Sequence, residues 1–219
     1  MKNKFNSAVE AAKKGNLDYA KKVFDMVLKK NSSNYAAYIN RGNVRRNLSD
    51  FNGALEDYNR AIKLEPERSE AYNNRANLFC HLCCFEEALN DINKAYELNP
   101  DSALILCNKG SIEARMELFQ EAESDLNEVI QKEPTFLLAY LCRGLLKEKT
   151  EDYIGAIKDY SVAIKFNGKY ADAYYHRGKV FMDYLNDESS AKNDMIKAMK
   201  LGAVMAGTYL TILNGLICN

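Results

Sequence analysis

The sequence has no excess of charge of either sign. Its 30 Lys and Arg residues balance 30 Asp and Glu residues over 219 positions. Proteins that bind nucleic acid or an anionic lipid surface through their overall charge are usually basic. The balance therefore predicts no nucleic-acid partner and no membrane partner.

Long apolar runs are also missing. The opening residues, MKNKFNSAVEAAKKGN, contain no continuous apolar core typical of a signal peptide, and no later run is long enough to span a bilayer. The six cysteines show no regular spacing that would indicate a disulfide framework. Together these absences predict a cytoplasmic protein with reduced thiols.

Signatures of catalysis are absent as well. The sequence has no phosphate-binding loop, no strand–turn–helix nucleophile and no paired acid and base. One cluster, Cys80, His81, Cys83 and Cys84, has metal-like spacing. A zinc site needs four converging ligands, whereas neighbouring residues on one helix point in diverging directions. We therefore expect no metal, no cofactor and no enzymatic activity; a cysteine-based metal or redox sensor is the weaker alternative.

What the sequence does contain is a repeat with a period of 34 residues. The segment 38–66, YINRGNVRRNLSDFNGALEDYNRAIKLEP, returns in later copies with the same residue types at the same places. Its marker positions are Tyr38, Gly42, Ala54, Tyr58, Ala61 and Pro66, followed in the next copy by Tyr72, Ala88, Ala95 and Pro100. A fixed period of this length predicts a solenoid of stacked helical hairpins.

This pattern resembles the tetratricopeptide repeat (TPR) family. The resemblance implies an all-α, right-handed superhelical solenoid of about six hairpins, which we expect to form a single domain over residues 1–219. The expected repeats are about 1–34, 35–68, 69–102, 103–136, 137–170 and 171–203, and a C-terminal helix is expected over 204–219. That last helix could cap the final hairpin, plug the groove or form a dimer contact.

Two series of opposite charge recur in register. Basic residues mark the first helix of each hairpin and aspartates mark the second: Arg41, Arg75, Lys109, Arg143 and Arg177, then Asp57, Asp91, Asp125, Asp159 and Asp194. An Arg–carboxylate pair can be bidentate and can fix the angle between two helices. We interpret these residues as a structural ladder of ion pairs within or between repeats.

A second series is made of amides. Asn40, Asn74 and Asn108 share one position of the first helix, and Asn43 and Asn77 lie three residues further along. In the TPR family these positions face the concave groove, where an amide can pair with the main chain of an extended peptide because it both donates and accepts. The alternative is that these residues are polar side chains on a solvated helix face.

Apolar residues occupy inner positions of the later repeats. Leu104, Leu138 and Leu141 are expected to take apolar side chains of the peptide, and Tyr175 continues the same line. The chaperone-binding clamp of the family is not expected, because Ile39, Leu104 and Asn108 stand where it needs cations.

The combined prediction is a non-enzymatic adaptor that binds a peptide or protein segment on its concave face. The alternative is a self-associating structural scaffold, a homodimer through the C-terminal helix or a chain whose groove is filled by that helix.

Overall fold

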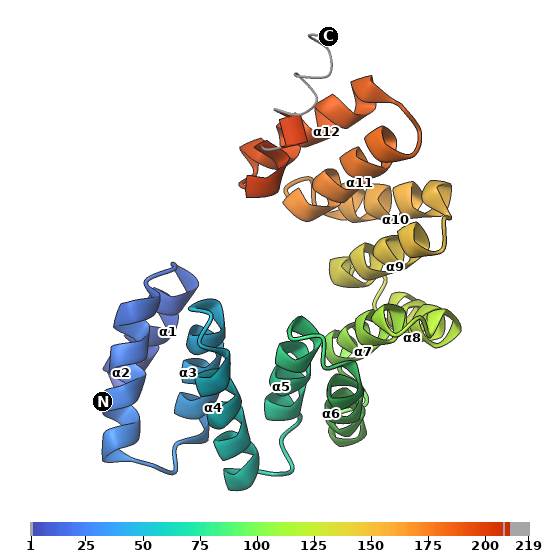
Figure 1. Ribbon diagram of the computed structural model, residues 1–219. Coiled ribbons are helices and arrows are strands. Elements are labelled where there is room, and N and C mark those ends of the chain that lie inside the picture. The colour runs from blue at the N-terminus through green and yellow to red at the C-terminus, as the bar shows by residue number, and fades with distance from the viewer. Residues whose placement is uncertain (1, 208, 211–219) are drawn as a thin grey trace. The chain divides into compact units, whose positions relative to one another are not determined.

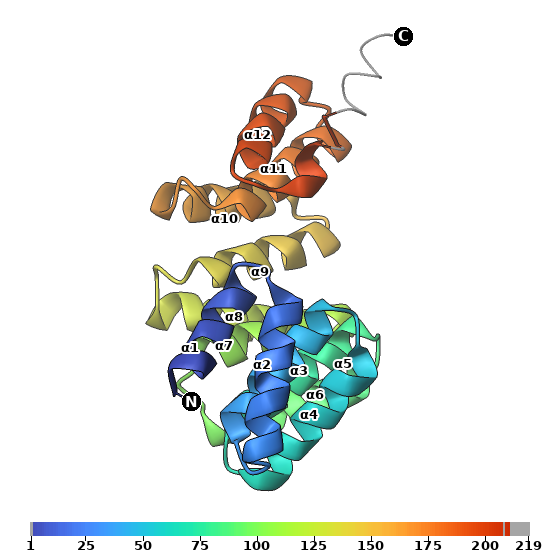
Figure 2. The same ribbon diagram turned by 90° about the vertical axis from the view of Figure 1, so that its left-hand side faces the viewer.

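Each repeat folds as a hairpin of two helices. In the computed structural model, which describes residues 2–207 and 209–210, paired helices such as α3 with α4 and α11 with α12 lie side by side (Figures 1 and 2). The helices are α1 (Lys2–Lys13), α2 (Leu17–Lys30), α3 (Tyr35–Asn47), α4 (Phe51–Leu64), α5 (Ser69–His81), α6 (Phe85–Leu98), α7 (Ala103–Arg115), α8 (Phe119–Lys132), α9 (Leu137–Lys149), α10 (Tyr153–Phe166), α11 (Ala171–Asp183) and α12 (Glu188–Lys200). The predicted all-α repeat fold is confirmed.

The chain divides into two compact units, and each is described by itself. Unit 1 is Met1–Asn108 and unit 2 is Lys109–Asn219. The expectation of a single domain over the whole chain stays a prediction.

The turns follow the sequence repeat. Between the two helices of a hairpin, a residue with φ of 61–64° closes the turn at the same place in four successive repeats: Ser49, Cys83, Glu117 and Glu151. Pro66 and Pro100 fall two residues after the ends of α4 and α6, where the missing N–H breaks no helical hydrogen bond. The two prolines of the repeat pattern thus lie just past the second helix of their hairpins.

Small residues let the helices approach one another closely. Ala54, Ala61, Ala88 and Ala95 are 0% exposed in unit 1, and the Tyr58 ring fills the space beside the first two of them. In unit 2, Ala156, Ala163 and Tyr160 repeat this arrangement. The core of each unit is therefore a stack of Ala-lined helix contacts filled by large side chains.

The sixth repeat carries a longer turn, because the distance in sequence from Gly178 to Ala191 is one residue longer than that from Gly144 to Ala156 in the fifth repeat. Helix α11 ends at Asp183 and α12 begins at Glu188. The additional length places Tyr184 against Tyr153, with ring centroids 3.9 Å apart and planes inclined by 14°. Tyr184 reappears below as one wall of a pocket.

Only part of the predicted C-terminal helix is among the described residues. Residues 204–207 and 209–210 are helical, and Ala206 and Leu210 pack against Met195 and Ala198 of α12. Residues 208 and 211–219 lie outside the described residues. The described part thus covers the last hairpin, as a capping helix would.

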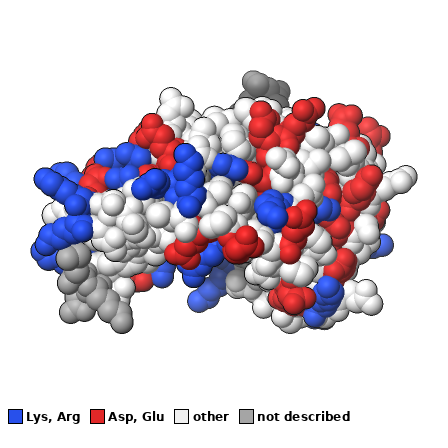
Figure 3. Space-filling model, turned by 90° about the horizontal axis from the view of Figure 1, so that it is seen from below, with Lys and Arg blue, Asp and Glu red and all other residues white. Residues whose placement is uncertain are grey.

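The described residues can be compared with what a membrane-spanning helix requires and with the charge balance of the sequence. None of the helices within 2–207 and 209–210 has the length and apolar character needed to cross a membrane. Charged side chains of both signs are exposed on the face drawn in Figure 3, in keeping with the balanced sequence.

Candidate functional site

The series of charged residues forms ion pairs between the two helices of the second to sixth hairpins. Arg41 Nη2 lies 2.6 Å from Asp57 Oδ1, and Arg143 Nη2 lies at the same distance from Asp159 Oδ1. The remaining pairs are Arg75–Asp91, Lys109–Asp125 and Arg177–Asp194. These ion pairs join the two helices of a hairpin, as the sequence predicts.

The arginines also bind the preceding hairpin, which sequence reasoning missed. Each donates through Nη1 to a residue 16 positions earlier: Arg41 to Asp25, Arg75 to Asn59, Arg143 to Asn127 and Arg177 to Ser161. One guanidinium therefore joins three helices. In the sequence, a hydrogen-bond acceptor recurs 16 residues before each of these arginines, but its residue type changes from repeat to repeat.

Most of the predicted Asn residues already make hydrogen bonds within unit 1. Asn40 Nδ2 donates to the Ala36 carbonyl at 2.8 Å, and Asn43 Oδ1 accepts from the Tyr58 hydroxyl at 2.7 Å. Asn108 Nδ2 donates to Asn73 Oδ1 at 2.8 Å. These bonds reduce, without exhausting, the capacity of the amides for a ligand.

Asn74 and Asn77 differ from the others. Asn74 Oδ1 is 3.5 Å from Asn73 Nδ2, a long contact. Asn77 lines a hollow of about 350 Å³ in unit 1 together with Arg46, His81 and residues of the α3–α4 turn. The amides most open to a ligand are therefore on α5.

The predicted apolar residues fall in different environments. Leu104 in unit 1 is 46% exposed, whereas Leu141 in unit 2 is 8% exposed and belongs to the core. Leu138 packs half-buried against that core. The Tyr175 ring contacts His176 and, at 6.4 Å between centroids, Tyr209. Of these residues, Leu104 has the most surface available for a partner.

Unit 2 contains a larger pocket of about 480 Å³. Ser111 and Ala114 of α7 line it, as do Cys142, Leu145 and Glu148 of α9, and Tyr184 of the long turn closes one side. Ser111 Oγ donates to Cys142 Sγ at 3.2 Å, and burial raises the pKa of the Cys142 thiol. This thiol is therefore protonated and is part of the wall rather than a nucleophile.

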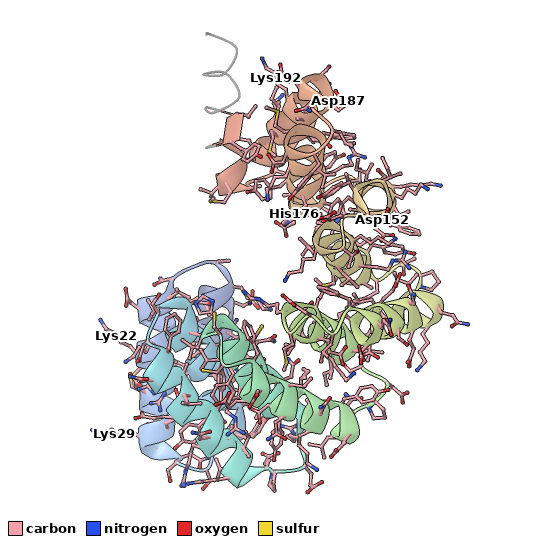
Figure 4. All side chains as sticks on the ribbon, turned by 45° about the vertical axis from the view of Figure 1, so that its right-hand side comes forward. Lys22, Lys29, Asp152, His176, Asp187 and Lys192 are labelled. Atoms are coloured by element: carbon pink, nitrogen blue, oxygen red, sulfur yellow. The ribbon has the colours of Figure 1, made fainter. Side chains whose placement is uncertain are left out.

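Glu148 lies close to two rings, the fully buried Tyr160 and the half-buried His176. The Tyr160 hydroxyl donates a short hydrogen bond to Glu148 Oε1, and His176 Nδ1 lies 3.9 Å from the same oxygen. Burial raises the pKa of Glu148 and lowers that of His176 to about 4, helped by the charge of Lys179. His176, labelled on α11 in Figure 4, is thus neutral at neutral pH and does not form an ion pair with Glu148.

Replacing His176 with Gln should make the protein less sensitive to acid. The ordinary pKa of His is about 6.5, so the unfolded chain gains a proton at His176 before the folded chain does. As pH falls from about 6.5 toward about 4, the wild-type chain should lose roughly 1–2 kcal/mol, allowing for partial exposure; the raised pKa of Glu148 acts in the opposite direction. Urea unfolding at about pH 7 and about pH 5 measures this difference.

The control for that experiment is His81→Gln, which changes an exposed imidazole on α5. It should keep the wild-type pH dependence. If His176→Gln keeps it as well, the acid sensitivity arises at other groups.

Within residues 2–207 and 209–210, no three His, Cys, Asp or Glu side chains are grouped to hold a metal ion. In the one cluster with metal-like spacing, Cys80 is buried and Cys83 is exposed, so their side chains do not converge.

Comparison with known proteins gives the same fold. Residues 35–68 and 69–102 each match a family model described as tetratricopeptide repeat. No curated protein sequence matches the chain. Among solved structures, PilW, described as a widely conserved type IV pilus biogenesis factor, has a TM-score of 0.78 at 20% identity and covers 95% of this chain and 97% of its own.

Two further structures are similar. TTC0263, a thermophilic TPR protein in Thermus thermophilus, has a TM-score of 0.76 at 20% identity, covering 83% of this chain and 98% of its own. YrrB, described as a TPR protein with an unusual peptide-binding site, has a TM-score of 0.54 at 18% identity, covering 86% and 97%. The matched repeats and the stacked hairpins show that the chain is a tetratricopeptide repeat protein, a member of a class of protein-interaction modules.

Proposed function

We propose that the protein is a non-enzymatic adaptor that binds an extended peptide or protein segment along the concave face, on the first helices of its hairpins. The observation that carries the proposal is the pocket of about 480 Å³ in unit 2, whose walls come from α7, α9 and Tyr184. A hollow of this size with mainly apolar walls and a few polar groups is typical of a ligand site. The peptide-binding site named for the structurally similar YrrB is consistent with this use of the fold.

The side chains predicted from the sequence have graded roles in this proposal. Asn40, Asn74 and Asn108 would pair with the peptide main chain, with Asn43 and Asn77 beside them, and Leu104 would contact an apolar side chain. Leu138, Leu141 and Tyr175 would contribute less, because each is half-buried or buried. A net gain of about 0.5–1.5 kcal/mol per amide hydrogen bond does not cover the roughly 2–5 kcal/mol needed to order a peptide. Side-chain pockets must therefore supply most of the affinity.

The proposal includes a cytoplasmic location for the protein.

Tyr184→Ala tests the proposal. A peptide library screened against the full chain should yield binders, and this variant should weaken them by about tenfold or more, since aromatic anchors dominate such interfaces. Tyr184 is 45% exposed, so its loss should change the melting temperature little. Calorimetric titration of the selected peptides measures the affinities.

The matched control is Tyr19→Ala, which removes a ring of similar exposure, 43%, from α2. It should leave peptide affinity unchanged. A library that yields no binder, or binders that tolerate Tyr184→Ala, would contradict the proposal.

Self-association is the second candidate function. Val204 and Met205, at the start of the C-terminal helical segment, are 86% and 62% exposed, which favours a contact with another surface. Light scattering of the full chain beside a chain ending at Leu201 tests this idea. A dimeric full chain and a monomeric truncation would favour the scaffold, whereas two monomers would argue against it.

A further inference from the structure

We propose that the pocket of unit 2 receives a cationic side chain, Lys or Arg, from the bound segment, with Glu148 as its counter-ion. This inference rests on the proposed function and specifies the kind of residue that the pocket selects.

Glu148 is a buried carboxylate without a cationic partner. Its side chain is 12% exposed, and within the described residues no Lys or Arg nitrogen lies within ion-pair distance of it. The buried aspartates of unit 2 contrast with it, because Asp159 is paired with Arg143 and Lys147, and Asp194 with Arg177. A buried charge is stabilised chiefly by pairing, so Glu148 has an unmet preference for a cation.

The other polar contacts of Glu148 leave that preference in place. The Tyr160 hydroxyl donates to Oε1 only. The nearby His176 is neutral, because burial depresses its pKa. One oxygen thus accepts a hydroxyl hydrogen bond, and the carboxylate keeps acceptor capacity on its pocket side.

Charges of both signs surround Glu148, and they differ in how exposed they are. Lys179 lowers and Asp183 raises the pKa of Glu148, so their effects on the carboxylate oppose each other. Arg115 and Lys149 also line the pocket, but both are exposed, where water screens their charge. Glu148 is therefore the least exposed charged side chain among the residues that line the pocket.

The walls suit the stem of such a side chain. Ala114, Leu145 and Leu146 contribute apolar surface to the same pocket that Glu148 lines. Lys and Arg bury their methylene stems against apolar surface while the charged head seeks a polar partner. The Tyr184 ring, on the wall contributed by the long turn, adds a face on which a cation is attracted.

The test uses side-chain analogues on the full chain. The probes are n-butylammonium and n-propylguanidinium, with n-butanol as the neutral match, and binding is followed by the NMR signals of the Leu145 and Leu146 methyl groups. The cations should bind about tenfold or more tightly than n-butanol, because charge-assisted hydrogen bonds are roughly twice as strong as neutral ones. The two cationic probes also show whether Lys or Arg is preferred.

Glu148→Gln should abolish the preference for cations. The glutamine side chain keeps the size of Glu148 and an oxygen that accepts from Tyr160, so the fold should be maintained. Glu123→Gln, an exposed change on α8, is the matched control and should retain the wild-type preference. Equal binding of n-butanol, a preference that survives Glu148→Gln, or no binding by any probe would overturn the inference.

The peptides from the library separate this inference from the proposed function. If they bind and lose affinity when Lys or Arg is replaced by norleucine, both are supported. If they bind equally well after that replacement, the function stands and the cation pocket is wrong. If no peptide binds but the cationic probes do, the pocket is right and the proposed function fails.

Discussion

Replacing Asp57 with Ala is expected to lower the free energy of unfolding by roughly 3–5 kcal/mol. The carboxylate is 1% exposed and accepts from Arg41 Nε at 2.9 Å, Arg41 Nη2 at 2.6 Å and Arg45 Nη1 at 3.0 Å. Its removal leaves two largely buried guanidinium groups without their common counter-ion. The loss should therefore exceed that of an ordinary hydrogen bond, about 0.5–1.5 kcal/mol.

Asp25→Ala is the matched control for this prediction. Asp25 binds the same guanidinium through Arg41 Nη1 at 2.7 Å, but its side chain is 39% exposed. Exposed ion pairs contribute about 0–1 kcal/mol, so the control should be only mildly destabilised. Urea unfolding followed by circular dichroism measures both variants, and equal losses would show that burial does not govern the strength of the ladder.

The ladder illustrates how much of the fold the sequence contains. Arg and Asp recur with the period of the repeat, so pairs between the helices of one hairpin could be predicted. The bond to the preceding hairpin uses Asp25, Asn59, Asn127 or Ser161. Since these share only an oxygen that accepts, and not a residue type, a search for repeated residues does not find them.

The candidate site is harder to predict from the sequence than the fold is. Periodicity places Asn43 on an inner helix position, but it does not show that the Tyr58 hydroxyl already occupies its oxygen. Tyr184 enters the pocket because an inserted residue lengthens one turn, and an insertion breaks the very register on which the prediction depends. Such contacts follow from tertiary packing and not from local pattern.

Glu148 was missed for a related reason. At the equivalent position the other five repeats have Ala12, Arg46, Cys80, Ala114 and Met182, so no single residue type marks the position. A search for repeats finds the residues that the copies share, and those shared residues build the scaffold. Residues that distinguish one copy from the next, as Glu148 does, are where binding specificity is expected in a repeat protein.

Core packing gives the second prediction with a large expected effect, a double-mutant cycle between Gly42 and Tyr58. A Cβ atom at Gly42 would lie 2.6 Å from Tyr58 Cε1, and the fully buried ring, whose hydroxyl is bonded to Asn43, has no room to move. Gly42→Ala should therefore destabilise the protein by about 1–3 kcal/mol. Tyr58→Ile should cost roughly 2–5 kcal/mol, because it leaves a cavity and removes the partner of Asn43.

The double variant should recover part of both losses, since the next repeat has Ala76 and Ile92 at these positions, each 0% exposed. The two changes should differ from additivity by about 0.5–3 kcal/mol in the stabilising direction. Gly110→Ala is a milder comparison, because its added Cβ would meet Leu126 Cγ at 3.0 Å and the Ala122 carbonyl oxygen at 3.2 Å, both farther away than Tyr58 Cε1 is at Gly42. If the losses in free energy of unfolding of the two single variants simply add in urea unfolding, the Gly–Tyr pair of this repeat cannot be replaced as a unit by the Ala–Ile pair of the next. Recovery would show that each hairpin contains its own complementary pair and that small and large residues at these two positions are matched one hairpin at a time.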